Sequence, residues 1–68
     1  MLGANIKNLR QHASMTQVGL AEAMGVSQQA VALWEAGKSA PQAVDIPKLA
    51  AVLKCSYDQL FNDKEVSQ

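Results

Sequence analysis

Two helix-start signals, each followed by a helix-stop signal, lie in succession near the centre of this chain and constrain its fold more than any other feature. Thr16 and Ser27 are good N-cap residues, and each directly precedes a helix-permissive segment. Gly25 and Gly37 follow those segments, where a glycine in the left-handed conformation ends a helix. The pattern predicts two short helices joined by a tight turn, a helix-turn-helix, over residues 16–37.

The second helix of this pair carries apolar and polar side chains on different sides. At ~100° per residue, one side holds Ala30, Val31 and Trp34, and the other holds Gln28, Gln29, Ala32 and Leu33. A glutamine amide has a donor and an acceptor in one plane, which matches N6 and N7 of adenine in the major groove. A solvated polar turn is the other interpretation of Gln28 and Gln29, and the caps on both sides favour DNA readout.

Three stretches of the chain carry a resemblance to a known family. IKNLR, MTQVGLAEAMGVSQQAVALWEAGKSAP and IPKLAAVL resemble the helix-turn-helix domain of the lambdoid phage repressors and Cro proteins, within the wider xenobiotic-response-element family. The match runs without gaps from about Ile6 to Leu60. The resemblance implies an all-α, lambda-repressor-like domain of five helices. It also implies a sequence-specific DNA-binding transcriptional regulator that occupies an operator.

The same resemblance implies a set of DNA contacts around the helix-turn-helix. The residues are Gln17, Ser27, Gln28, Gln29, Ala32, Leu33, Lys38 and Ser39. Gln28 and Gln29 would read base edges, while Gln17 would bind a phosphate and brace Gln28. Ala32 and Leu33 would offer apolar surface to a thymine methyl group. Ser27 would use its hydroxyl on a phosphate or base, and the loop after the second helix would touch the DNA backbone.

An arginine and a glutamate are expected to form a structural ion pair. Glu35 falls in the last turn of its helix, where its charge meets the negative end of the helix dipole and needs a cation nearby. Arg10 follows Ile6 by four residues and so lies at the edge of a buried face. In the resembling family the matching residues pair and tie the first helix to the third.

Three further helices flank the central pair. The first has a predicted core stripe of Leu2, Ile6, Leu9 and Ala13. Asp45 is the expected N-cap of the fourth, since Pro47 is tolerated only in a first turn. The stripe of this fourth helix would be Ile46, Leu49, Ala50 and Leu53. Ser56 and Gln59 have the spacing of a capping box and predict a short fifth helix.

The partner implied by the resemblance is double-stranded DNA with a palindromic operator. A two-fold protein would place its half-sites ~34 Å apart on the duplex, which predicts a homodimer at least when bound. The resemblance locates the dimer contact around the fifth helix, at Tyr57, Asp58 and Phe61.

The charge balance argues in the opposite direction. Six basic and six acidic residues give a formal net charge of zero, whereas DNA-binding domains are typically basic. Segregation of the charges onto two faces would still permit binding. A protein-interaction module or an antitoxin on the same fold, with weak or no DNA binding, therefore stays open as the alternative.

Composition excludes several other classes. The single cysteine, Cys55, has no partner for a disulfide or a metal site, and we expect no cofactor. We expect no enzyme, because no nucleophile is spaced to pair with His12. A membrane span is not expected, since no run of ~20 apolar residues occurs, and the expected location is the cytoplasm. We assign residues 1–62 to the DNA-binding domain and residues 63–68 to a polar tail.

Overall fold

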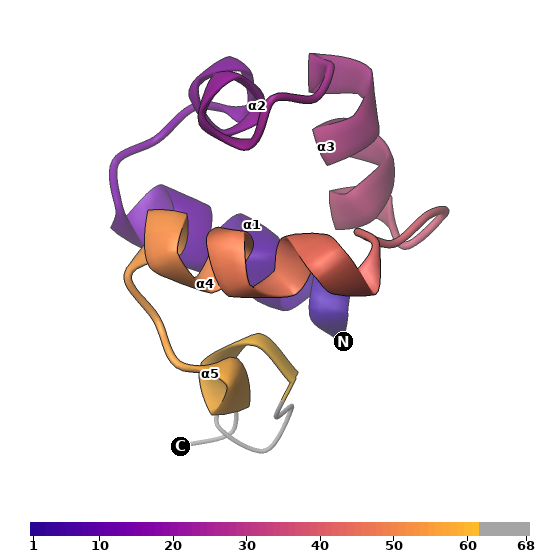
Figure 1. Ribbon diagram of the computed structural model, residues 1–68. Helices are drawn as coiled ribbons and strands as arrows, with labels where there is room; N and C mark the ends of the chain where they lie inside the picture. Colours follow the sequence, from indigo (N-terminus) through magenta and orange to yellow (C-terminus); the bar gives the residue numbers. More distant parts are fainter. Residues whose placement is uncertain (62–68) are drawn as a thin grey trace.

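Five α-helices and one short 3-10 turn make up the part of the chain that the structure, a computed structural model, describes, residues 1–61 (Figure 1). In chain order they are α1 (Leu2–His12), α2 (Gln17–Met24), α3 (Gln28–Ala36), η1 (Ala43–Asp45), α4 (Ile46–Leu53) and α5 (Tyr57–Phe61). No strand occurs within these residues, so the all-α class and the five helices expected from the sequence are confirmed. The predicted tail, residues 63–68, lies outside the described residues, and the boundary at residue 62 stays a prediction.

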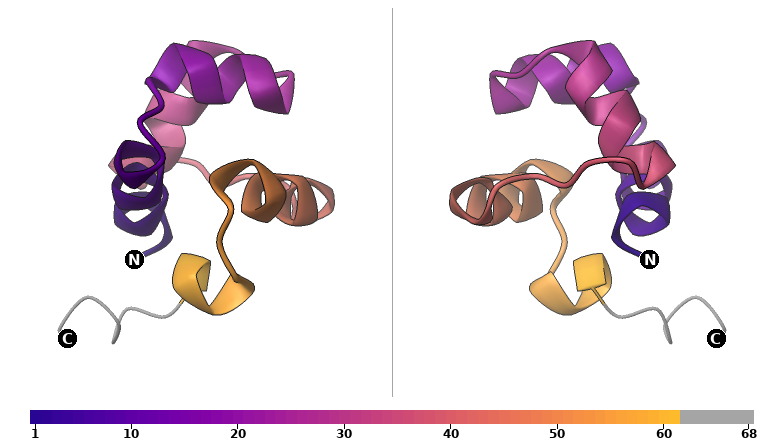
Figure 2. Two further views of the ribbon diagram at one scale, coloured as in Figure 1. Left: turned by 90° about the vertical axis from the view of Figure 1, so that its left-hand side faces the viewer. Right: turned by 90° about the vertical axis from the view of Figure 1, so that its right-hand side faces the viewer.

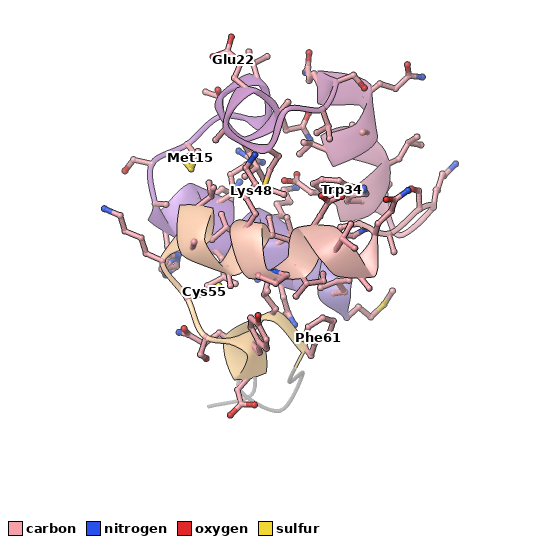
Figure 3. The ribbon with its side chains drawn as sticks, viewed as in Figure 1. Met15, Glu22, Trp34, Lys48, Cys55 and Phe61 are labelled. Carbon is pink, nitrogen blue, oxygen red and sulfur yellow. The ribbon has the colours of Figure 1, made fainter. Side chains whose placement is uncertain are left out.

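The five helices surround one aliphatic core. Each contributes one side chain with no exposed surface, and these are Ile6, Leu20, Val31, Leu49 and Leu60. Views from two opposite sides show α2 and α3 above, α1 and α4 on opposite sides below them, and α5 at the bottom (Figure 2). Trp34 extends from α3 towards the interior and is only 5% exposed (Figure 3). Because the side of α3 that carries Val31 and Trp34 packs into the core, the opposite side of the helix faces solvent.

The predicted caps of the helix-turn-helix are confirmed. The hydroxyl oxygens of Thr16 and Ser27 each accept the backbone N–H three residues further on, at 2.9 and 3.1 Å. Gly25 and Gly37 end α2 and α3 in the left-handed conformation, with φ of 75° and 77°. These local signals set the lengths of both helices and the tight turn between them.

The starts of the last two helices agree with the sequence in most respects. The backbone N–H of Ser56 donates to Oε1 of Gln59 at 2.9 Å, and the N–H of Gln59 donates to Oγ of Ser56 at 3.1 Å. This is the predicted capping box of α5. Asp45 is the residue before α4, with Pro47 in the first turn, but its side chain makes no cap hydrogen bond. The η1 turn leads directly into α4 instead.

The expected stripe of α1 needs correction at its end. Ala13 is exposed, because α1 ends at His12 and the chain turns away from the core there. Two residues of α1 that the apolar pattern did not include, Gly3 and Asn5, are buried. Gly3 packs so closely on α3 that a Cβ would overlap with the carbonyl oxygen of Trp34. Nδ2 of Asn5 donates to the carbonyl oxygen of Leu60 at 2.8 Å, which ties α1 to α5.

Lys54 ends α4 in the left-handed conformation, with φ of 55°. This conformation costs a residue with a Cβ about 1–2 kcal/mol, and glycine avoids that cost. Glycine also gains entropy in the unfolded chain, which offsets part of this benefit, so we expect Lys54→Gly to raise the free energy of unfolding by about 0.5–1 kcal/mol. Urea unfolding measures the change, with Lys54→Ala as the control for the lost charge. A glycine variant no more stable than the alanine variant would contradict this explanation.

Two observations concern the length of the helices and the chemistry of the single cysteine. No helix in the described part of the chain is long and apolar enough to cross a membrane. Cys55 is half-buried against the core, and burial raises the pKa of its thiol above the ordinary value. A thiol with a raised pKa stays protonated at neutral pH and is a poor nucleophile.

Candidate nucleic-acid interface

The ion pair implied by the resemblance is present between α1 and α3. Nε of Arg10 donates to Oε2 of Glu35 at 2.6 Å, and Nη2 donates to Oε1 at 3.1 Å. This bidentate geometry, with two N–H groups on the two carboxylate oxygens, is the strong form of an arginine–carboxylate pair. Nη1 of Arg10 also donates to the carbonyl oxygen of Met15 at 2.8 Å. One guanidinium therefore ties α1, the loop before α2 and the last turn of α3 together.

The two charges of this pair stabilise each other. Burial of the carboxylate raises the pKa of Glu35, but the hydrogen bonds from Arg10 and Gln17 and the charges of Arg10 and Lys7 outweigh it, so the pKa lies below its ordinary value. The hydrogen bond to Glu35 raises the pKa of Arg10 by more than burial lowers it. Glu35 is accordingly an ionised carboxylate at neutral pH.

Gln17 connects this ion pair to the start of α3. Its Nε2 donates to Oε1 of Glu35 at 3.0 Å, and its Oε1 accepts from Nε2 of Gln28 at 3.4 Å. The contact with Gln28 matches the brace implied by the resemblance. The contact with Glu35 is new, and no spacing rule could have found it, because the two residues lie 18 positions apart on different helices.

The candidate DNA contacts on α3 lie on its outward side. Ser27, Gln28, Gln29, Leu33, Lys38 and Ser39 are exposed, and Gln17 and Ala32 are half-buried. In the right-hand view of Figure 2, α3 lies nearest the viewer and no other helix covers it. Val31 and Trp34 are buried on its other side. The expected division of α3 into a core side and an outward side is therefore present, and its role in DNA binding stays a prediction.

Groups that donate hydrogen bonds lie at the starts of α2 and α3 and in the loop that follows α3. The hydroxyl oxygen of Ser27 accepts the N–H of Ala30, which leaves its own proton for an outside acceptor. The first N–H groups of α2 and α3 carry the positive end of each helix dipole. Lys38 adds a full positive charge in the exposed loop that follows α3. Such a set of donors suits an anionic ligand.

A second exposed region lies at the other end of the molecule, on α5. Tyr57 and Phe61 are each 53% exposed and, four residues apart in one helix, share a side. Asp58 beside them is also exposed. Figure 1 shows α5 on the far side of the molecule from α2 and α3, and Figure 3 shows Phe61 below α4. The candidate dimer residues therefore do not compete with α3 for a ligand.

The described residues contain no group of three or more His, Cys, Asp or Glu side chains placed to hold a metal ion. The candidate interface consists of amides, hydroxyls, one lysine and the apolar side chains of Ala32 and Leu33. These side chains can form hydrogen bonds and van der Waals contacts with a ligand. The two helix caps and the Gln17–Gln28 hydrogen bond hold them in place relative to one another.

The fold and this face together define a helix-turn-helix domain of the lambda-repressor-like type. The helix-turn-helix family model matches residues 6–60, and the chain belongs to that family. The HTH-type transcriptional regulator DicA of Escherichia coli K12 is 35% identical over 65 residues, covering 94% of this chain. That match covers 48% of DicA, so the chain spans about half the length of this relative.

Two solved structures have the same fold as this chain. The P22 c2 repressor, crystallised with a synthetic operator, superposes with a TM-score of 0.83 at 29% identity, over 91% of this chain and 94% of that one. The restriction-modification controller protein C.AhdI from Aeromonas hydrophila gives a TM-score of 0.80 at 30% identity, over 88% and 91% of the two chains.

Proposed function

We propose that this chain is a sequence-specific, DNA-binding transcriptional regulator of the repressor and Cro type that acts by occupying an operator. The observation that carries the proposal is the outward face of α3, where Gln28 is exposed and hydrogen-bonded to Gln17 at the start of α2. The similarity to a repressor crystallised with its operator supports the same function. The narrower assignment to the xenobiotic-response-element group is part of this proposal.

In the proposed complex, the first turn of α3 enters the major groove. The exposed amides of Gln28 and Gln29 read base edges, and a bidentate pair with adenine is the contact that suits them. Leu33, at 36% exposure, and Ala32 lie further along the same side and meet thymine methyl groups. Base contacts of this kind carry the sequence preference.

Phosphate contacts then hold α3 in register on the duplex. The donors are the hydroxyl of Ser27, the N–H groups at the helix starts, Gln17, and Lys38 with Ser39 in the loop after α3. Several of these donors carry no formal charge. A chain with no net charge can therefore bind the DNA backbone through hydrogen bonds and helix dipoles.

We propose that the bound species is a homodimer on a palindromic operator, in the cytoplasm. The exposed pair Tyr57 and Phe61, with Asp58 between them, supplies the contact, because it offers an apolar surface away from α3. A two-fold protein presents its two α3 helices to half-sites about 34 Å apart. Residues 1–62 form the binding domain in this proposal, with a polar tail at 63–68.

The alternative on the same fold is a protein-interaction module or antitoxin with weak or no DNA binding. The net charge of zero favours it, while the similarity to an operator-bound repressor favours DNA binding. A gel shift against random duplex at low salt separates the two, since a DNA-binding protein retains non-specific affinity there.

Gln28 and Gln29 should decide sequence preference, whereas Gln17 should contribute affinity on every operator and influence preference only at the base read by Gln28. Gln28→Ala removes up to one bidentate contact per half-site, worth about 1–3 kcal/mol of discrimination against the wrong base. Its effect should vanish on operators already changed at the base it reads. Gln17→Ala should weaken every operator by a similar factor through its phosphate contact and also relax the preference at the base read by Gln28, where the brace is lost.

The measurement is a matrix of these variants against single-base operator changes. A uniform loss of affinity for Gln28→Ala and Gln29→Ala across all operators would mean that α3 does not read bases.

Salt dependence should be shallow for a DNA-binding protein. Lys38 lies two residues beyond the end of α3, and the charge of Lys7 lowers the pKa of Glu35. With these two cations in each half, a dimer neutralises about four phosphates, which gives a log–log slope of affinity against salt near about −4. Titrations at several salt concentrations measure the slope. A value steeper than about −8 would show that other basic residues meet the DNA.

A further inference from the structure

A series of hydrogen bonds connects Gln28, on the exposed side of α3, to Glu35 in the ion pair. In each of them the donor lies on the Gln28 side and the acceptor on the Glu35 side. Nε2 of Gln28 donates to Oε1 of Gln17 at 3.4 Å, and Nε2 of Gln17 donates to Oε1 of Glu35 at 3.0 Å. Glu35 receives two further hydrogen bonds from Arg10. The series ends on a carboxylate whose pKa is held below its ordinary value, so Glu35 has no proton to give.

This end point fixes the orientation of both amides. An ionised carboxylate only accepts hydrogen bonds, so Gln17 must turn its NH2 group to Glu35. Its oxygen then faces Gln28, and Gln28 must turn its own NH2 group to Gln17. The remaining N–H and the oxygen of Gln28 face outward in a fixed order, with the nitrogen on the side of Gln17.

The order of these two atoms decides which base edge fits. Adenine presents an acceptor at N7 and a donor at N6, in fixed positions along the major-groove edge. If the amide of Gln28 were rotated by half a turn, its oxygen would face N7 and its N–H would face N6. Donor would meet donor and acceptor would meet acceptor, and the match with adenine would be lost.

We propose that Glu35 is a positioning residue for base recognition, setting the preference of Gln28 through the orientation of Gln17. This inference rests on the proposed function, because it concerns the base that Gln28 reads. The side chain of Glu35 is only 5% exposed and that of Arg10 only 10%. Water is therefore kept from the carboxylate, which stays the acceptor for Gln17.

Glu35→Gln tests the assignment because it keeps the shape but adds a donor. A glutamine at this position can accept from Gln17 or donate to it, so both orientations of Gln17 and Gln28 become available. In the wild type we expect discrimination of about 5- to 150-fold at the base pair read by Gln28. In Glu35→Gln the discrimination at this base pair should fall towards that measured for Gln28→Ala. The discrimination at the base pair read by Gln29 should be retained.

Two further variants separate positioning from loss of stability. Ile6→Val removes a methylene group from the core on α1, away from the series, and should leave the discrimination at both base pairs unchanged in folded protein. Gln17→Met removes the hydrogen bonds of Gln17 to Glu35 and Gln28 but keeps both hydrogen bonds between Arg10 and Glu35. It should reduce discrimination at the Gln28 base pair as Glu35→Gln does. In the Gln17→Met background, Glu35→Gln should cause no further change in preference.

The outcomes distinguish this inference from the function on which it rests. If Gln28→Ala relaxes one base pair but Glu35→Gln and Gln17→Met weaken all operators equally, the positioning role is wrong and the proposed function stands. If Gln28→Ala changes no base preference, both are wrong. Selective relaxation in Glu35→Gln and Gln17→Met, at the same base pair as in Gln28→Ala, supports the positioning role.

Discussion

Arg10→Ala should lower the free energy of unfolding by about 3 kcal/mol, far more than the loss of an exposed charge. The guanidinium makes two hydrogen bonds to Glu35 and one to the carbonyl oxygen of Met15. Its removal leaves a sheltered carboxylate without its main compensating charge. Since small domains are stable by only about 5–15 kcal/mol, the variant should melt many degrees below the wild type.

Thermal and urea unfolding measure this effect, with Lys7→Ala as the control for loss of a positive charge from the same helix. Lys7 is exposed and contacts Glu35 only through its charge, so its variant should unfold close to the wild type. Glu35→Gln should be milder than Arg10→Ala, because an amide still offers an acceptor to Arg10. Equal stability of Arg10→Ala and Lys7→Ala would contradict a structural role for the pair.

Gly3→Ala should lower the free energy of unfolding by about 1–3 kcal/mol. An added Cβ would overlap with the carbonyl oxygen of Trp34 and lie 3.0 Å from that of Glu35. Both atoms belong to the backbone of α3, so α1 must move away from α3 to relieve the overlap. The same movement would disturb the Arg10–Glu35 pair, which spans the two helices.

Gly19→Ala is the matched control for this substitution. A Cβ there meets only the side-chain oxygen of Thr16, at 3.3 Å. A shift of a few tenths of an ångström in that exposed side chain relieves the contact and keeps its cap hydrogen bond to the backbone N–H of residue 19. Alanine is favoured over glycine in a helix by about 0.5–1 kcal/mol, so this variant should be slightly more stable than the wild type. If Gly3→Ala also proved neutral or stabilising in urea unfolding, the close contact between α1 and α3 would be wrong.

The features that the sequence predicted correctly are local or periodic. A cap depends on one side chain and a backbone N–H three residues away, which is why Thr16, Ser27 and the Ser56–Gln59 box could be assigned from spacing alone. The core side of α3 follows from the period of a helix. The family pattern added the Arg10–Glu35 pair, which periodicity could place only at the edge of a buried face.

The features that the sequence did not predict depend on contacts between helices. Asn5 is buried because its amide finds the carbonyl oxygen of Leu60, 55 positions away, and a polarity pattern assigns such a residue to the surface. Gly3 is required by the close approach of a second backbone, which leaves no mark on its own helix. Ala13 continues the apolar spacing of α1 but lies beyond the end of the helix.

The candidate site divides in the same way. Exposed side chains on α3 could be listed from one helix, whereas the Gln17–Glu35 contact needed the three-dimensional arrangement of α2 against the end of α3. The proposed functions of these residues depend on an absent partner, the DNA.

Selection of bound duplexes from a random-sequence library, at low salt and with protein shown to be folded, tests the central claim most directly. We expect the wild type to enrich a two-fold symmetric motif with half-site centres about 34 Å apart. Gln28→Ala and Gln29→Ala should each enrich a motif that differs only at the base pairs they read. Enrichment of no motif by folded wild-type protein, or of an identical motif by all three proteins, would contradict DNA readout by α3.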